Sequence, residues 1–185
     1  MTIVTNMGSM PWPASIVNIM HTMHWLMVET IFAEGVVVII LNLIWTRDWS
    51  WKYLGKQLGF LVPYSVLMQC FADCWRWFGI DQMPVWPRIC FDFIGLFSAF
   101  VGFTIYQNAN FRHPHDELSI TLKRRFNVKF MKQFNMIMPI LIVIACACHN
   151  RAVFAVNIGT VVGMLTQKRV VDWCERFYYR ARKAF

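Results

Sequence analysis

Charged residues are scarce in this 185-residue chain: Asp, Glu, Lys and Arg make up only 15% of it, whereas a soluble domain carries about a quarter. Apolar residues make up 57% of the chain, and they collect in runs such as Val36–Leu43 and Phe93–Ile105. This composition excludes a soluble globular enzyme, a disordered tail and a nucleic-acid-binding module with a basic, water-facing surface. An integral membrane protein remains, with no nucleic acid among its expected partners.

Motifs for catalysis are also missing. The chain contains no Ser–His–Asp order, no HExxH, no P-loop and no GxGxxG, which are the patterns that carry common chemistries. Its six cysteines lie in or beside apolar runs and lack the spacing of a secreted disulfide framework. We therefore expect a protein that is not an enzyme, has no cofactor and keeps its cysteines reduced.

Five stretches approach the roughly 20 apolar residues that a helix needs to cross a bilayer. They are Trp25–Trp45, Gln57–Phe78, Ile89–Gln107, Phe134–Cys148 and Ala152–Gln167. The last two are short and only residues 149–151 separate them, so they predict either a thin spanning hairpin or a re-entrant pair. No internal repeat stands out. The sequence thus predicts an all-α integral membrane protein, a small bundle of about five transmembrane helices.

Basic residues are distributed unevenly between the loops. With the N-terminus outside, the inner segments 46–57, 108–133 and 168–185 hold 15 of the 18 Lys and Arg. Basic residues are retained on the cytoplasmic side during insertion, so the split predicts an N-out, C-in orientation. The chain then divides into an extracytoplasmic segment (1–24), a membrane domain (25–167, including the basic loop 108–133) and a basic cytoplasmic tail (168–185). The expected location is the cytoplasmic membrane of a bacterium.

Ionisable side chains at membrane depth are costly, and they indicate functional sites. The candidates are Glu34, Glu29, Asp92, Asp73 and Arg76. Glu34 lies about 14 Å along a helix from Trp25, so its carboxyl must be protonated, paired or in contact with water. Two roles stay open for it: a proton or cation site, or a hydrogen bond between helices. Asp73 and Arg76 share one helix face and predict a local ion pair at the outer interface.

Small residues recur along two of the expected helices, where they allow close approach of another backbone. One stripe consists of Ala155, Gly159 and Gly163, and the other of Gly95, Ala99 and Gly102. Packing within one subunit and packing between subunits both explain such stripes. Because five helices give a small bundle with little interior, we expect one stripe to join subunits into a homo-oligomer.

The two longest cytoplasmic segments are basic and amphipathic. In the loop, Leu118, Leu122, Phe126 and Phe130 recur every four residues, and Lys123, Arg124, Arg125 and Lys129 fill the other face. The tail combines an aromatic face with Arg176, Arg180, Arg182 and Lys183. Such helices suit anionic lipid headgroups or a protein partner. His113 and His115 precede two acids, but a structural zinc site needs a second ligand cluster, so we expect no metal.

Two functions follow from these features. The first is a non-enzymatic, multi-pass membrane subunit that self-associates and docks a cytoplasmic partner or anionic lipid through its basic loop and tail. The alternative is an oligomeric cation or proton channel, or a holin-like pore, in which Glu34 and also Glu29 or Asp92 line a polar path.

Overall fold

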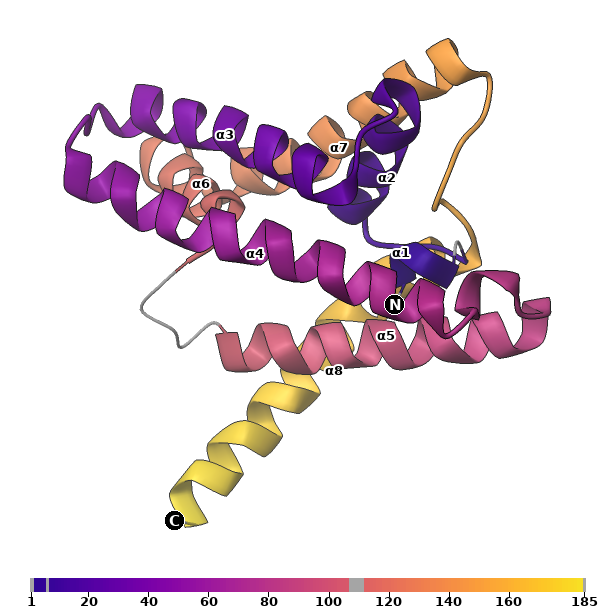
Figure 1. Ribbon diagram of the computed structural model, residues 1–185. Helices are drawn as coiled ribbons and strands as arrows, with labels where there is room; N and C mark the ends of the chain where they lie inside the picture. The colour runs from indigo at the N-terminus through magenta and orange to yellow at the C-terminus, as the bar shows by residue number, and fades with distance from the viewer. Residues whose placement is uncertain (1, 6, 107–111, 185) are drawn as a thin grey trace. The chain divides into compact units, whose positions relative to one another are not determined.

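The computed structural model describes residues 2–5, 7–106 and 112–184, and all regular structure in them is helical (Figure 1). The elements are α1 (Thr2–Thr5), α2 (Pro11–Met23), α3 (Met27–Thr46), α4 (Trp51–Trp77), the 3₁₀ turn η1 (Ile80–Gln82), α5 (Val85–Tyr106), α6 (Pro114–Arg125), α7 (Val128–Asn150) and α8 (Ile158–Ala184). Among the described residues, α3, α4, α5 and α7 are long and apolar enough to cross a membrane. The predicted all-helical class is confirmed, with four candidate membrane spans where five were expected.

The chain packs as two compact units. We call residues 15–71 and 111–153 the α3 unit, and residues 1–14, 72–110 and 154–185 the α5 unit. The α3 unit contains α3, α6, α7, most of α2 and the first part of α4. The α5 unit contains α1, η1, α5, α8 and the ends of α2 and α4.

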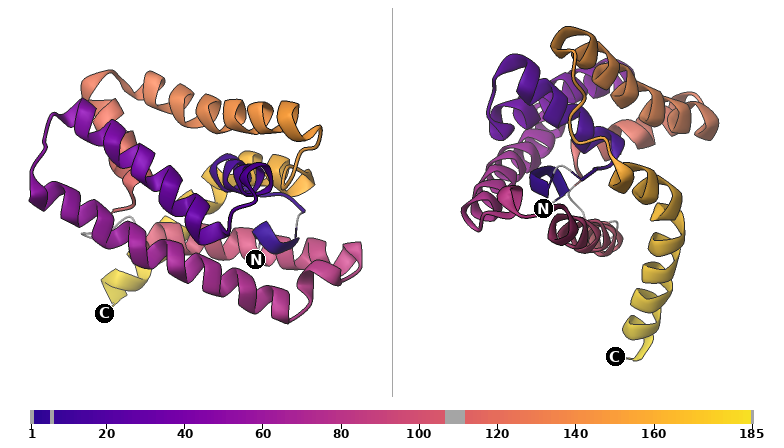
Figure 2. Two further views of the ribbon diagram at one scale, coloured as in Figure 1. Left: turned by 45° about the horizontal axis from the view of Figure 1, so that its top comes forward. Right: turned by 90° about the vertical axis from the view of Figure 1, so that its right-hand side faces the viewer.

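Helices α3 and α7 run in opposite directions within the α3 unit (Figure 2). The ring of Trp45, at the end of α3, packs edge-on against Phe134 near the start of α7, with centroids 5.8 Å apart. At the other end, Asn150 of α7 donates a 2.8 Å hydrogen bond to Thr22, which precedes α3. The two helices therefore share both ends in antiparallel order.

Helix α6 packs on α3, and this corrects the single amphipathic helix expected in the basic loop. Asn127 caps a new helix, α7, by accepting a 2.7 Å hydrogen bond from the amide of Phe130. The chain therefore turns after Arg125, and the apolar residues of the loop are divided between two helices. Leu118 and Leu122 are buried against Val38 of α3 instead of facing the inner leaflet.

The expected hairpin of two 15-residue helices is also wrong. Helix α7 continues to Asn150 and ends where Arg151 adopts a left-handed backbone (φ 53°). Residues 151–157 are not helical, and the next helix, α8, runs on into the tail. Ala155 also has a positive φ (54°), and its carbonyl accepts a 3.1 Å hydrogen bond from the Ser9 amide. Ala155 thus lies outside the helix that carries the two glycines of its predicted stripe.

In the α5 unit, α5 and α8 lie side by side and run in the same direction. Gly159, at the start of α8, contacts Asp92, and Gly163 one turn later packs against Leu96. Further along, Cys174 of α8 and Thr104 of α5 line one hollow. Helix α8 therefore accompanies the candidate span α5 over most of its length.

Two runs of three helices have similar lengths. Helices α2, α3 and α4 contain 13, 20 and 27 residues, and α6, α7 and α8 contain 12, 23 and 27. Corresponding landmarks lie 103 or 104 positions apart: Pro11 and Pro114 begin the short helices, Arg47 and Arg151 end the middle helices in left-handed conformations, and Gly55 and Gly59 correspond to Gly159 and Gly163. The similarity lies in helix length and in the conformation at the end of the middle helix.

Candidate functional site

A buried carboxyl occupies the middle of α3. The Glu34 side chain is only 9% exposed. Ser15 of α2 hydrogen-bonds to this carboxyl, and His115 Nε2 of α6 lies 3.9 Å from its Oε1. This Oε1 accepts no hydrogen bond from the part of the chain that the structure describes. Polar groups on two short helices thus converge on one carboxyl in the centre of a candidate span.

The start of α6 presents two stacked imidazoles beside this carboxyl. His113 is the N-cap of α6, and its Nδ1 accepts a 3.3 Å hydrogen bond from the His115 amide. Pro114 follows at the first helical position, where its fixed φ and missing N–H are tolerated. The His113 ring packs against the ring of Tyr64 of α4 (4.8 Å) and against that of His115 (5.2 Å). The cap and the ring stack together fix the orientation of His115 toward Glu34.

Both imidazoles are neutral at neutral pH. Burial lowers the pKa of His113 to about 4, and burial together with the neighbouring His113 lowers the pKa of His115 to about 3. The contact between His115 and Glu34 at pH 7 therefore involves an uncharged imidazole and is not a salt bridge.

We expect His113 and His115 to reduce the stability of the folded protein as the pH falls from about 6.5 toward 4. In that window an unfolded histidine binds a proton while His113 and His115 do not, so acid favours the unfolded state by about 1.4 kcal/mol per pH unit for each residue. The thermal unfolding midpoint in detergent, measured against pH, should therefore fall less toward acid in His115→Gln than in wild type, whereas His24→Gln, at an exposed position, should follow wild type. An unchanged slope in His115→Gln would contradict the assignment.

A buried amide ties three helices together next to the imidazoles. Asn42 of α3 donates from Nδ2 to Gln57 Oε1 of α4 (2.9 Å) and to the Pro114 carbonyl of α6 (3.0 Å). Both side chains are almost fully buried. Asn42 Oδ1 and Gln57 Nε2 make no hydrogen bond within the described residues.

The sequence identified Glu34 but missed its surroundings. Ser15, Asn42, Gln57 and His115 come from four helices, and no spacing rule links them. Asn42 was the one available signal, since it interrupts an otherwise apolar run between Val36 and Trp45.

The other predicted carboxylates have different environments. Glu29 is exposed, and its carboxylate accepts a 2.8 Å hydrogen bond from the Leu26 amide, which caps α3. Asp73 and Arg76 form the predicted pair, 3.2 Å apart and exposed. Asp92 is buried in the α5 unit and accepts a 2.9 Å hydrogen bond from Thr5 of α1. Glu29 therefore caps a helix, and Asp92 connects α1 to α5. Neither is among the residues that contact Glu34.

The predicted packing residues fall into a buried group and an exposed group. Gly159 and Gly163 are buried within the chain, against Asp92 and Leu96. A Cβ on Gly102 would meet nothing within 4 Å, and Ala99 is exposed. The glycines of α8 therefore pack inside the subunit. Ala99 and Gly102 of the α5 stripe are not covered by other described residues.

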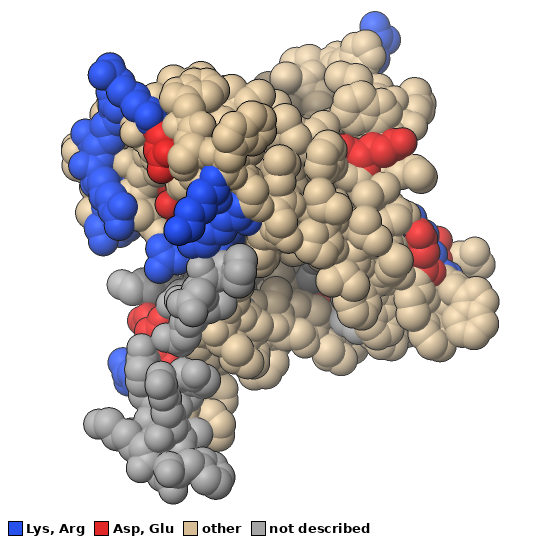
Figure 3. All heavy atoms as spheres, turned by 60° about the vertical axis from the view of Figure 1, so that its left-hand side comes forward, with Lys and Arg blue, Asp and Glu red and all other residues tan. Residues whose placement is uncertain are grey.

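Basic side chains gather at one end of the α3 unit, where α3 and α6 end and α4 and α7 begin (Figure 3). Lys123, Arg124, Arg125 and Lys129 all lie there and are exposed. Arg176 is exposed on α8. Arg180, Arg182 and Lys183 belong to α8, but their side chains lie outside the described residues. Among the residues described, no three His, Cys, Asp or Glu are arranged to hold a metal ion.

Together these features describe an all-helical protein with four candidate membrane spans in its described residues and a buried polar centre in the α3 unit. The chain belongs to a family of unknown function, DUF6198, whose family model matches residues 1–176. No curated protein and no solved structure matches the chain.

Proposed function

We propose that this protein conducts protons across the membrane, with Glu34 as the group that binds and releases them. The observation that carries the proposal is the contact of Ser15 and His115, from two short helices, with one buried carboxyl in the centre of a candidate span. Carboxyl groups at membrane depth are rare and typically belong to ion or proton pathways. A single carboxyl between a hydroxyl and a neutral imidazole suits a proton better than a metal ion, which needs several charged or oxygen ligands.

The two short helices approach Glu34 from opposite ends of α3. At 13 and 12 residues, each is about 20 Å long, too short for a 30 Å hydrocarbon core. Helix α2 ends near the start of α3, where Thr22 meets Asn150. Helix α6 ends near the close of α3, where Arg125 donates to the Trp45 carbonyl (2.6 Å). Ser15 and His115 both belong to the N-terminal parts of such short helices, and secondary transporters typically build ion sites from half-length helices.

The proton pathway is tested with purified protein in liposomes. An outward potassium gradient makes the interior of the liposomes electrically negative and so drives proton entry. A pH-sensitive dye inside the liposomes reports the resulting acidification. We expect acidification well above that of protein-free liposomes. Equal rates with and without protein, at verified incorporation, would overturn the proposal.

Five crossings with the N-terminus outside remain our proposal for the topology. Residues 47–56 and 112–132 place nine Lys and Arg at one end of the α3 unit, while Arg151 is the single basic residue in the rest of that unit. This asymmetry supports a cytoplasmic position for the basic end. Helix α8 runs beside α5 and has 27 residues, about 40 Å of helix. Its packing supports a fifth crossing, although Lys168 and Arg169 lower its hydropathy.

Reporter fusions test the fifth crossing directly. Alkaline phosphatase is active only outside the cytoplasm, whereas green fluorescent protein exported unfolded is dark. We expect a fusion after Asn157 to show phosphatase activity and a fusion after Phe185 to fluoresce. If both positions report the same side, α8 does not cross, and the basic tail would lie outside against the positive-inside rule.

Docking of a cytoplasmic partner is a second candidate, favoured by the corner between α6 and α7. There Phe126 and Phe130 are exposed with ring centroids 4.6 Å apart, next to Lys123 and Lys129. Aromatic and basic side chains together are common at interfaces. A photo-crosslinking residue at Phe126 should then yield one discrete protein adduct in intact cells. Adducts with lipid alone would contradict protein docking at this corner.

A further inference from the structure

A turn of four residues, 47–50, connects two of the candidate membrane spans. Helix α3 ends at Thr46, and α4 begins at Trp51. A chain that leaves and re-enters a bilayer within four residues reaches outward by about 7 Å, which is about the thickness of one headgroup layer. The turn and the two helix ends beside it therefore lie at the level of the lipid headgroups.

Two exposed tryptophans lie at this turn. Trp49 is 67% exposed and Trp51 is 86% exposed. The turn is held by hydrogen bonds from the Ser50 amide to Asp48 Oδ1 (3.0 Å) and from the Tyr53 amide to Ser50 Oγ (3.3 Å). Tryptophan is enriched where a membrane protein passes from hydrocarbon into the headgroups. The two indoles therefore support the position of the turn at the membrane surface, and they offer an apolar contact to a lipid there.

Positive charge accompanies the indoles. Arg47 and Lys52 are exposed on either side of them, and neither forms an ion pair with any residue that the structure describes. Asp48 is the one acid between them in the sequence, and its carboxylate already accepts the hydrogen bond from Ser50. Two cations against one occupied carboxylate leave the turn positive, so it attracts a phosphate.

An apolar stripe on α3 leads to Arg47 from inside the bilayer. Val37, Ile40 and Ile44 are each 46–57% exposed, and residues three and four positions apart share one helix face. The stripe extends for about 10 Å and ends three residues before Arg47. A lipid whose acyl chain follows this stripe has its headgroup at the turn, which is the orientation of a phospholipid in that leaflet.

We propose that the α3–α4 turn binds one anionic phospholipid. The phosphate contacts Arg47 and Lys52, the glycerol region lies beside the two indoles, and an acyl chain follows the stripe on α3. The position of the turn favours a lipid over a soluble protein, because headgroups surround it. Its charge favours an anionic lipid over a zwitterionic one, since each basic residue near an anionic surface contributes about fivefold in affinity. The site is independent of Glu34 and of which side of the membrane the turn faces.

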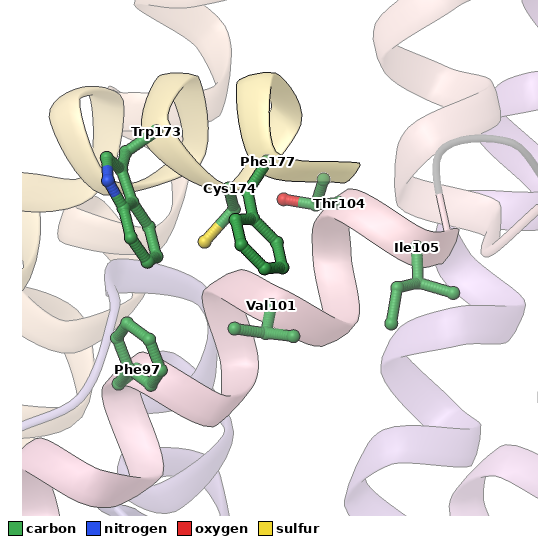
Figure 4. Close-up of a pocket in the computed structure, with 7 residues that line it drawn as sticks. All are labelled: Phe97, Val101, Thr104, Ile105, Trp173, Cys174 and Phe177. Carbon is green, nitrogen blue, oxygen red and sulfur yellow. The ribbon is translucent and has the colours of Figure 1, made fainter. Parts of the chain in front are cut away.

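Delipidated protein titrated with phosphatidylglycerol or phosphatidylcholine and followed by native mass spectrometry tests the site. Wild type should bind the first phosphatidylglycerol about tenfold more tightly than phosphatidylcholine, and the double variant Arg47→Gln/Lys52→Gln should lose this preference. The matched control is Arg76→Gln/Arg151→Gln, which removes two exposed arginines away from the turn and should retain it. Lipid bound in the apolar hollow between α5 and α8 does not affect the comparison, because the residues that line it are uncharged (Figure 4).

Asp48→Asn tests the site in the opposite direction. Asparagine keeps an oxygen for the Ser50 amide but removes the negative charge. The affinity for phosphatidylglycerol should therefore rise about fivefold, while that for phosphatidylcholine stays unchanged. Thermal unfolding verifies the folding of each variant, and this expected gain keeps the test decisive if the double variant does not fold.

The proposal is wrong if wild type binds the two lipids equally, if the double variant keeps the preference, or if the control variant loses it to the same extent. The last result would assign the preference to net charge alone. Displacement of the bound lipid by an equal concentration of inorganic phosphate would also contradict the proposal, because it would assign Arg47 and Lys52 to a soluble anion.

Discussion

Replacing Glu34 with Gln should abolish proton flux while the protein stays folded. Glutamine keeps the size of the side chain and can still hydrogen-bond with Ser15, but it neither binds nor releases a proton near neutral pH. Because proton transfer by a positioned group is worth about 100-fold or more in rate, flux in liposomes should fall to the level of protein-free vesicles. The unfolding midpoint in detergent should remain close to that of wild type.

Two further variants separate transport from helix packing. Glu29→Gln alters an exposed carboxylate on the same helix that caps its start, so it should leave flux unchanged. Glu34→Leu removes both titration and hydrogen bonding, and it should abolish flux and cost about 1 kcal/mol of stability, the scale of interhelical hydrogen bonds in membranes. If Glu34→Gln conducts like wild type, Glu34 only connects helices, and the proposed proton pathway is wrong.

Gly159→Ala should strongly destabilise the α5 unit. A Cβ at this position would overlap with Asp92 Oδ2 and lie 3.1 Å from the Met7 carbonyl oxygen. Asp92 has little freedom to move, because Thr5 donates a 2.9 Å hydrogen bond to its other oxygen. Overpacking of this kind costs about 1–3 kcal/mol, and breaking the Thr5–Asp92 hydrogen bond adds about 1 kcal/mol. Thermal unfolding followed by tryptophan fluorescence should show a midpoint several degrees lower.

Gly102→Ala is the matched control for this substitution. A Cβ on Gly102 meets nothing within 4 Å, and alanine favours a helix by up to about 1 kcal/mol over glycine. Its midpoint should equal or exceed that of wild type. If Gly159→Ala leaves the midpoint unchanged but alters the mass of the detergent-solubilised protein, Gly159 packs between subunits instead of within one.

Sequence reasoning located α3, α4 and α5 because each crossing requires one long apolar run, and such runs are visible in a single chain. The Asp73–Arg76 pair was equally accessible, since three-residue spacing on a helix brings two side chains together without help from the rest of the fold. The amphipathic loop was misread for a related reason. A stripe such as Leu118 and Leu122 requires an apolar neighbour, but the sequence does not reveal whether that neighbour is lipid or another helix.

The ends of helices are a second feature that the sequence does not predict reliably. The sequence correctly predicts a break between two helices near Arg151. It places the start of the last helix at Ala152, whereas α8 begins at Ile158. The segment that contains Ala155 is apolar enough for a helix, and it is held in another conformation by a backbone hydrogen bond from Ser9, a residue distant in the chain. A local pattern cannot anticipate a partner of that kind.

Long apolar runs are enough to predict a helical membrane protein, and the position of Glu34 within the first run is enough to mark it as a costly, deep carboxyl. The residues that surround this carboxyl could not be predicted, because they depend on the tertiary structure. Ser15 and His115 are 19 and 81 positions from Glu34, on helices too short to span a bilayer. They reach the carboxyl because α2 and α6 pack inside the α3 unit, and such packing depends on contacts between helices that no local pattern specifies.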